Sequence, residues 1–144
     1  PGRYRNVIPN FIYWAMTGQP LPITGTGEET RDFIFVDDMV DGLVRCGTTP
    51  EAAGQAINLG TGVQTQVIEL ANKVLALTGS SSPIVYTARR DWDHSKTRQA
   101  DNSKAREVIG LDPQVRIDAG LKATVAWFED NMDDIRPVAE AAFQ

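Results

Sequence analysis

Basic residues gather in one stretch of an otherwise acidic chain. Residues 86–106 hold six lysines and arginines against three aspartates, whereas the whole 144-residue sequence has 14 basic and 19 acidic residues and a formal charge of −5. Arginine suits phosphate because its planar guanidinium presents parallel N–H donors to two oxygens at once. The stretch predicts either a local anion site or a salt-bridged surface. Its basic residues are Arg89, Arg90, Lys96, Arg98, Lys104 and Arg106.

A further arginine, Arg31, stands at the start of a predicted strand over 31–36. An unpaired guanidinium in a largely buried strand is costly, so Arg31 needs an anionic partner. That partner is either a carboxylate, such as Asp32 or Asp38, or a phosphate group of a bound ligand. The charges alone leave both alternatives open.

Two glycine turns, Gly25-x-Gly27 and Gly60-x-Gly62, invite comparison with dinucleotide-binding loops. The fingerprint needs a third glycine three residues later, and these positions hold Thr30 and Thr65. The second turn follows a predicted strand and precedes a predicted helix, so a phosphate could approach it. Ordinary tight turns explain both loops, and neither is a good dinucleotide fingerprint.

The remaining candidates for acid/base, metal or nucleophilic chemistry have structural explanations. Asp37 and Asp38 open a predicted helix, where capping and the helix dipole account for two carboxylates. His94 is predicted to lie in a surface loop, and Cys46 to be a packed small side chain. With one cysteine and one histidine, the composition supports no zinc site.

Composition narrows the class of protein. The length and the 42% hydrophobic content suit one globular domain with its own core. The acidic balance argues against a nucleic-acid partner, and no apolar run approaches the length needed to span a bilayer. A single cysteine favours a reducing compartment, so we expect a cytoplasmic protein without a membrane partner.

Hydrophobic periodicity predicts alternating helices and strands. Thr65 is the predicted N-cap of the clearest helix, and Gly79 its end. The absence of repeats and low-complexity linkers predicts a single α/β unit, with a frayed tail from Met132 onward. Helices are expected over residues 7–17, 37–45, 65–78, 103–109 and 117–128, and strands over residues 21–24, 31–36, 55–59 and 84–87.

The run from Gly18 to Asp38, GQPLPITGTGEETRDFIFVDD, carries a recognisable pattern. It resembles the second half of extended short-chain dehydrogenases/reductases, the NAD-dependent nucleotide-sugar epimerases and dehydratases of the UDP-glucose 4-epimerase kind. The resemblance covers about residues 1–130. It continues through Asn58-Leu-Gly-Thr-Gly62, Arg89-Arg90 with Asp93, Ala100-Asp101-Asn-Ser-Lys104-Ala105, Ile109-Gly110-x-x-Pro113, Gly120-Leu121 and Trp127-Phe128.

The resemblance implies a small α/β domain of mixed sheet and helices over residues 1–131, followed by a tail over 132–144. The resemblance identifies this domain as similar to the C-terminal part of an extended Rossmann-type dehydrogenase/reductase, without the N-terminal dinucleotide-binding half. The family's G-x-x-G-x-x-G loop and Tyr-x-x-x-Lys pair do not occur in this sequence. We therefore expect no catalytic residue here and no metal. NAD belongs to the complete family protein, and none is expected to bind this segment alone.

Carried over by position, the family's contacts imply a binding site for a nucleoside diphosphate sugar, UDP- or TDP-linked. Arg98 is either a second phosphate contact or a surface residue, because the stretch after Asp93 departs from the family pattern. The implied contacts are Asn6 and the Val7 backbone on the diphosphate side, Ile23 and Thr24 against the base, Arg31 and Arg90 on the phosphates, Asp93 near the ribose or orienting Arg90, and Arg89 as their neighbour.

The implied function is substrate binding within an NAD-dependent sugar epimerase or dehydratase, with little catalysis by this segment alone. One alternative is a stand-alone or remnant nucleotide-binding module without activity. Another is a separately encoded half that assembles with a Rossmann partner. A missing half would leave apolar faces exposed and favour self-association.

Overall fold

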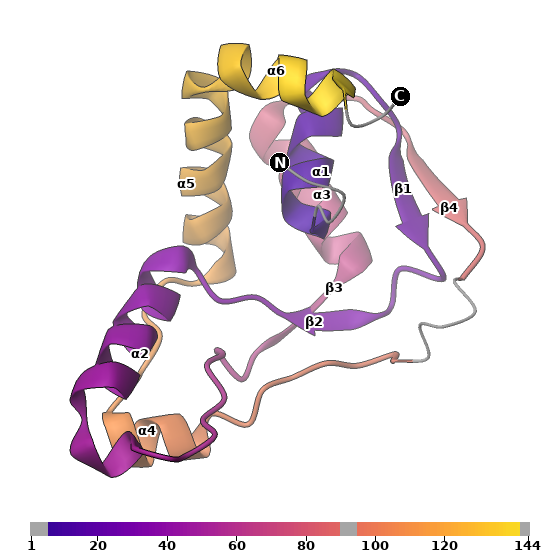
Figure 1. The fold of residues 1–144 in the computed structure, drawn as a ribbon. Coiled ribbons are helices and arrows are strands. Elements are labelled where there is room, and N and C mark those ends of the chain that lie inside the picture. The colour runs from indigo at the N-terminus through magenta and orange to yellow at the C-terminus, as the bar shows by residue number, and fades with distance from the viewer. Residues whose placement is uncertain (1–5, 90–94, 142–144) are drawn as a thin grey trace. The chain divides into compact units, whose positions relative to one another are not determined.

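The computed structural model describes residues 6–89 and 95–141. They pack as two compact units, each assembled from separated stretches of the chain (Figure 1). The first unit comprises Pro1–Gly27, Ile68–Arg90 and Leu121–Gln144, and the second comprises Glu28–Val67 and Asp91–Gly120. The lack of a linker predicted a single α/β unit, and this domain assignment stays a prediction beside the two compact units. The domain boundary at residue 131 stays a prediction.

The first unit combines helices with a two-stranded parallel sheet. Leu21 pairs with Ile84, and the register continues to Thr24 opposite Thr87, so the predicted strands over 21–24 and 84–87 are confirmed. The elements of this unit are β1 (Leu21–Thr24), β4 (Ile84–Thr87), α1 (Val7–Met16), α3 (Val67–Thr78), α5 (Ile117–Asp130) and α6 (Met132–Ala141). Of α3 and α5, the residues from Ile68 and from Leu121 onward belong to this unit.

Periodic apolar residues build the core of the first unit. In α3 the buried side chains recur at helical spacing, and the helix ends before Gly79, whose φ of 62° is left-handed. The β1 side chains that alternate inward are fully buried. The core residues of the first unit are Phe11, Ile12, Tyr13, Ala15, Leu21, Ile23, Leu70, Ala71, Val74, Leu121, Val125, Phe128 and Ala139.

The second unit pairs a short antiparallel ribbon with helices. In the ribbon, Arg31 lies opposite Thr65 and Asp32 lies opposite Gln64. Gly42 lets its helix approach closely, since a Cβ there would lie 3.0 Å from the side chain of Leu111. The elements are β2 (Thr30–Asp32), β3 (Gln64–Gln66), α2 (Val36–Thr48), the 3-10 helix η1 (Pro50–Ala52) and α4 (Ser103–Ile109), around a core of Ala52, Ala105, Ile109 and Leu111.

Three predicted elements of the second unit differ in the structure. The strand expected over 31–36 is limited to β2, and α2 begins at Val36 after an extended Phe35. Residues 55–59 form no strand, because in the described chain they have no strand partner; Ile57 and Leu59 pack on the core instead. Thr65 does not cap α3 but lies buried in β3.

The C-terminal residues also differ from expectation. The segment expected to be frayed forms α6, which contains Pro137 and buries Ala139. Burial of one face stabilises this helix despite the proline in its interior. Across residues 6–89 and 95–141, no helix combines the length and apolarity needed to cross a bilayer. The cytoplasmic location stays a prediction.

Candidate functional site

The best-defined candidate site surrounds Arg31, in the second unit. Arg31 is partly exposed, and its Nη1 donates to the carbonyl oxygen of Thr30 at 2.7 Å and to that of Ser95 at 3.4 Å. These two carbonyls, from different stretches of the chain, restrict where the guanidinium can lie. An arginine oriented in this way is prepared to bind an anion, because less side-chain freedom remains to be lost on binding.

The segment that follows Ser95 runs beside the start of β2. The Thr30 N–H donates to the carbonyl oxygen of Lys96 at 2.9 Å, and the Arg98 N–H donates to the carbonyl oxygen of Thr30 at 3.1 Å. Thr30 and Thr97 form a parallel bridge between these backbones. The backbone pairing therefore places two further basic residues on the segment adjoining Arg31, and both are exposed.

The carboxylate of Asp32 joins three stretches of the second unit. Oδ1 accepts from the backbone N–H of Thr61 at 3.0 Å and from its hydroxyl at 2.5 Å. Oδ2 accepts from the N–H of Gly62 at 2.9 Å and from that of Ala100 at 3.2 Å. Four hydrogen bonds use the accepting capacity of an ionised carboxylate almost completely. Asp32 thus binds internal backbone groups.

This arrangement also answers whether the turn from Gly60 to Gly62 could receive a phosphate. The N–H groups of Thr61 and Gly62, which would have to point at a phosphate, point at the carboxylate of Asp32 instead. The turn is followed by β3 and not directly by a helix. Its residues therefore do not fit the pyrophosphate of a dinucleotide such as NAD, and the reading as a tight turn is the better one.

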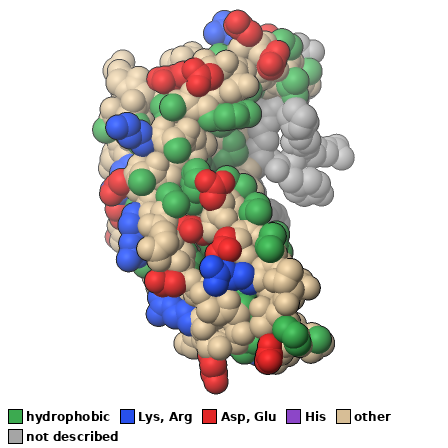
Figure 2. All heavy atoms as spheres, turned by 90° about the vertical axis from the view of Figure 1, so that its left-hand side faces the viewer, with side chains coloured by type: hydrophobic (Ala, Val, Ile, Leu, Met, Phe, Trp, Pro, Cys, Tyr) green, Lys and Arg blue, Asp and Glu red, His purple; other side chains and the backbone are tan. Residues whose placement is uncertain are grey.

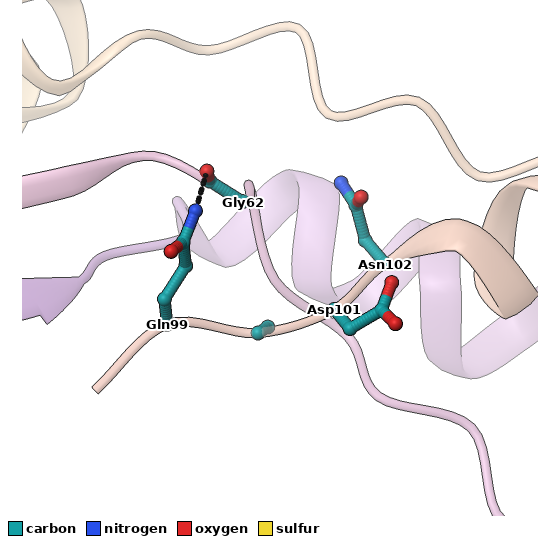
Figure 3. Close-up of a pocket in the computed structure, with 5 residues that line it drawn as sticks. Gly62, Gln99, Asp101 and Asn102 are labelled. Atoms are coloured by element: carbon teal, nitrogen blue, oxygen red, sulfur yellow. Dashed lines mark hydrogen bonds between the residues drawn. The ribbon is translucent and has the colours of Figure 1, made fainter. Parts of the chain in front are cut away.

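A chain of side-chain amides lies beside this turn. The Thr30 hydroxyl donates to Oε1 of Gln64 at 2.8 Å, and Nε2 of Gln64 donates to Oε1 of Gln99 at 2.7 Å. Nε2 of Gln99 then donates to the carbonyl oxygen of Gly62 at 2.5 Å (Figure 3). The network therefore ties the β2–β3 ribbon to the segment that contains Gln99.

A polar hollow of about 350 Å³ opens beside the network. The buried amide of Asn102 donates to the carbonyl oxygens of Gly60 and Thr61 at 3.4 and 3.2 Å. The three polar side chains that line the hollow, Gln99, Asp101 and Asn102, thus bond to the protein itself, which favours a structural role for the hollow. Its lining residues are Gly62, Gln99, Ala100, Asp101 and Asn102 (Figure 3).

Asp101 lies just before α4 and is fully exposed, with its Oδ1 accepting from the Ser103 N–H at 3.0 Å. Hydrogen bonds from the Ser103 side chain and backbone hold the pKa of Asp101 below its ordinary value of 3.8. Because folding lowers this pKa, ionised Asp101 favours the folded chain above its unfolded-state pKa. That contribution is lost as pH falls through the folded-state value.

The predicted capping role of Asp37 and Asp38 is corrected in part. Both lie in the first turn of α2, where the helix dipole favours them, but the N-cap is Phe35 and has no side-chain capping bond. Asp38 instead accepts from the backbone N–H groups of Gln114 and Val115 at 3.1 and 2.9 Å. It therefore fastens the loop before α5, a long-range role that helix position alone does not indicate.

The other candidates for nucleophilic, acid/base or metal chemistry are Cys46 and His94. Cys46 is a free, partly buried thiol packed against the core of the second unit, as predicted. His94 lies outside the described residues. Within residues 6–89 and 95–141, no cluster of three or more histidine, cysteine or acidic side chains has the geometry of a metal site.

The residues predicted to bind the nucleotide fall in both units. Arg31 belongs to the second unit, whereas Asn6, Val7, the β1 residues and Arg89 belong to the first. Arg90 and Asp93 lie outside the described residues. No one unit contains all these residues, and their shared role stays a prediction.

Within the first unit, three of the predicted contacts lie in β1 or shortly after its partner strand β4. Ile23 pairs with Tyr86 and Thr24 with Thr87, and Arg89 follows β4 by two residues. The side chain of Ile23 is fully buried, so a contact with a base would have to use its backbone. Thr24 is partly exposed, and Nη2 of Arg89 is buried.

At the start of α1, Asn6 is the N-cap residue, and its side chain makes no capping hydrogen bond. Asn6 is exposed and Val7 is partly exposed. The first helical turn therefore presents both residues at the surface of the first unit, as a ligand contact would require.

The sequence reasoning missed Asp32, Thr61, Gln64 and Gln99 as site-building residues. From the sequence, Asp32 was expected only as a possible ion-pair partner of Arg31. The available signal was the combination of one carboxylate with a glycine turn, whose backbone N–H groups commonly bind an anion. Nothing in the sequence indicated that the two would meet across 29 residues.

Comparison with known proteins defines the class. A model of the NAD dependent epimerase/dehydratase family matches residues 1–60. UDP-glucose 4-epimerase from Mycolicibacterium smegmatis is 38% identical over 124 residues, which are 86% of this chain and 39% of that protein. The solved structure of epimerase Mth375 from Methanothermobacter thermautotrophicus is 51% identical, with a TM-score of 0.92 over 95% of this chain and 41% of that one.

WbmF from Bordetella bronchiseptica, solved with NAD+ and UDP, is 37% identical with a TM-score of 0.82. The match covers 95% of this chain and 41% of the WbmF chain. The fold is thus that of part of an extended short-chain dehydrogenase/reductase. The chain belongs to the NAD-dependent epimerase/dehydratase family and spans about two fifths of the length of these relatives.

The close approach at Gly60 yields a stability prediction. A Cβ at Gly60 would lie 2.4 Å from the Cβ of Ala100 and 3.0 Å from the carboxylate of Asp32. Gly60→Ala should therefore destabilise the chain by about 1–3 kcal/mol, because the crowded backbones must move apart. Thermal or urea denaturation measures the change.

Gly47→Ala is the matched control, because nothing lies within 4 Å of a Cβ at Gly47 in α2. It should stabilise the chain by about 0.5–1 kcal/mol. Adding Ala100→Gly to Gly60→Ala should restore much of the lost stability. Equal stability of the Gly60→Ala variant and the parent chain would contradict the crowded geometry.

The hydrogen bonds to Asp101 predict the direction of a pKa change. Ser103→Ala removes the side-chain bond and should raise the pKa of Asp101 toward 3.8, as followed by the pH titration of its carboxyl carbon in NMR spectra. Ser81→Ala, in the first unit, should leave that titration unchanged. An unchanged Asp101 titration in Ser103→Ala would show that the hydroxyl does not stabilise the carboxylate.

Proposed function

We propose that this chain supplies the nucleoside-diphosphate-binding part of an NAD-dependent enzyme that acts on nucleotide sugars. The observation that carries the proposal is the guanidinium of Arg31, which is oriented by the carbonyls of Thr30 and Ser95. A segment with two further basic residues pairs with the strand that bears it. Charge-assisted hydrogen bonds from arginine are strong and suit the oxygens of a diphosphate.

The family comparison supports the substrate class. One solved relative contains UDP together with NAD+, and one curated relative is a UDP-glucose 4-epimerase. In the proposed site, Arg31 binds a phosphate and Arg98 is a second candidate on the adjoining segment. The family resemblance also proposes nucleotide contacts for Arg90 and Asp93 and, on the first unit, for Asn6, Val7, Ile23, Thr24 and Arg89.

The proposed role is binding and orientation of the substrate. In the complete family protein, NAD supplies transient oxidation of a sugar hydroxyl. This sequence has no Tyr-x-x-x-Lys pair to move the accompanying proton. The residues of this chain therefore contribute binding energy, which holds the sugar in a reactive orientation.

Nucleotide titration tests the proposal. UDP and UDP-sugars at millimolar concentration should raise the melting temperature of the chain, because a ligand that binds only the folded state stabilises it. Parallel titrations with TDP- and GDP-sugars show which nucleotide base the site prefers. No shift with any of these nucleotides would contradict the binding function.

Substitution of Arg31 identifies the site. Arg31→Ala should weaken UDP binding by about 1.5–3 kcal/mol, as expected for a lost charge-assisted hydrogen bond. Arg31→Lys should recover part of this loss by keeping the charge. Arg106→Ala is the matched control from the same unit, since the exposed Arg106 side chain pairs with Asp112 at 3.5 Å. Equal losses in Arg31→Ala and Arg106→Ala would exclude a specific role for Arg31.

The exposed face of α2 supports a second part of the proposal. Four large apolar side chains lie on it at spacings of four, three and one residues, and each is more than half exposed. In a helix this spacing forms one stripe of the kind that normally faces a core. Hydrophobic side chains are visible on the molecular surface in Figure 2. The α2 stripe consists of Val36, Val40, Leu43 and Val44.

We infer that the α2 stripe packs against the remainder of the family fold, carried on the same polypeptide or on a separate one. The length comparison supports this occupant, because the chain reproduces the fold of relatives while covering only about two fifths of their length. Exposed apolar stripes of this kind usually mark interaction surfaces.

Leu43→Lys tests the α2 stripe. The chain should associate with the separately expressed part of epimerase Mth375 that it does not match, and Leu43→Lys should abolish this association without lowering stability. Leu77→Lys in α3 is the control, because Leu77 is 39% exposed and lies outside the stripe. Analytical ultracentrifugation measures both. Self-association of the chain through the same residues, with no binding of the added part, would overturn the proposed occupant.

A further inference from the structure

The geometry points to Asp32 as a positioning residue for the proposed phosphate contact of Arg31. The inference rests on the proposed function and adds to it a residue that touches no ligand. Neighbouring residues of a strand point to opposite faces. The guanidinium of Arg31 and the carboxylate of Asp32 therefore serve different partners, although they are adjacent in the sequence.

The first step is the anchoring of the segment beside Arg31. Its far end is held by the bond from the Ala100 N–H to Oδ2 of Asp32, at 3.2 Å. Its middle is held by the two backbone bonds between Thr30 and the Lys96 and Arg98 positions. The β2 residues on either side of Arg31 thus fix this segment at two places.

The second step links that segment to the guanidinium. The near end of the segment contributes the carbonyl oxygen of Ser95, which is the second acceptor for Nη1 of Arg31. If the Ala100 bond is lost, the segment keeps only its backbone bonds to Thr30, so its position along β2, and with it the position of the Ser95 carbonyl, is less firmly fixed. The bond from Arg31 to Ser95 is already long at 3.4 Å, so a small shift is enough to break it.

The third step concerns what the carboxylate does not do. Both oxygens of Asp32 accept two hydrogen bonds each. A carboxylate filled in this way has little capacity left to pair with Arg31. Asp32 therefore does not neutralise its sequence neighbour Arg31, and its role toward Arg31 runs through the segment that both residues contact.

A matched control lies in the same unit. Asp38 also accepts two backbone N–H bonds, from Gln114 and Val115, and fastens a loop. None of those bonds involves the segment that contains Ser95 and Ala100. Asp32→Asn and Asp38→Asn should both lower stability, since each turns an amide donor toward backbone donors. Only Asp32→Asn should change the motion of the Arg31 side chain and its contribution to UDP binding.

The first measurement needs no ligand. Nitrogen-15 relaxation of the Arg31 side chain should show increased motion in Asp32→Asn and none in Asp38→Asn. Amide hydrogen exchange at Ala100 should accelerate in the same variant. An unchanged Arg31 side chain in a folded Asp32→Asn protein would overturn the inference, whatever the chain binds.

The second measurement is a double-mutant cycle with UDP as the probe. Asp32→Asn should weaken UDP binding roughly tenfold in the parent chain and have almost no effect in an Arg31→Ala background, because the two residues act as a unit. Equal weakening in both backgrounds would show that Asp32 acts independently of Arg31. If the parent chain binds no UDP, the proposed function fails, and the relaxation measurement alone decides the inference.

Gly60→Ala provides a second route if Asp32→Asn does not fold. Its Cβ would push against Ala100 and leave the carboxylate chemically intact. It should increase the motion of the Arg31 side chain, and adding Ala100→Gly should reverse the increase. A folded Gly60→Ala protein with an unchanged Arg31 would count against transmission through this segment.

Discussion

Four hydrogen bonds to one carboxylate determine the arrangement of the second unit. Asp32 accepts from Thr61, Gly62 and Ala100, which are 29 to 68 residues away in the sequence. A partly buried carboxylate that lost these donors would be an uncompensated charge, so the three stretches must assemble together. The requirement explains why Gly60 has no room for a side chain. It also explains why the glycine turn is not open to a phosphate.

The basic residues of the chain differ in their partners. Arg31 is held by backbone carbonyls beside a segment with two more basic residues. Other arginines have local partners: Arg45 pairs with Asp41 at 2.8 Å along α2 and donates to the carbonyl oxygen of Gly110. Exposed pairs of this kind contribute little free energy. Because basic residues gather around Arg31, the chain can offer a local site for an anion even though its acidic residues outnumber its basic ones.

Local patterns predicted most helices correctly, because periodic apolar residues and a following glycine act within one or two turns. The helices expected over 103–109 and 117–128 are present as α4 and α5, and α4 ends at Gly110 in a left-handed conformation. Strands were less predictable. Residues 55–59 look like a buried strand, yet a strand needs a partner, and in the described chain they have none. The alternating aromatic residues after Asp32 likewise lead into a helix.

The amino-acid sequence by itself determined the acidic balance, the basic stretch, most helix positions and the family resemblance, since these depend on residue types and short spacings. Tertiary structure alone decided which groups the carboxylates of Asp32 and Asp38 bind. Charge pairing had suggested that Asp32 or Asp38 could neutralise Arg31. The structure gives Asp32 to the glycine turn and Asp38 to the loop before α5. The physical reason is that buried backbone N–H groups must find acceptors, and which ones lie in reach depends on how distant segments pack.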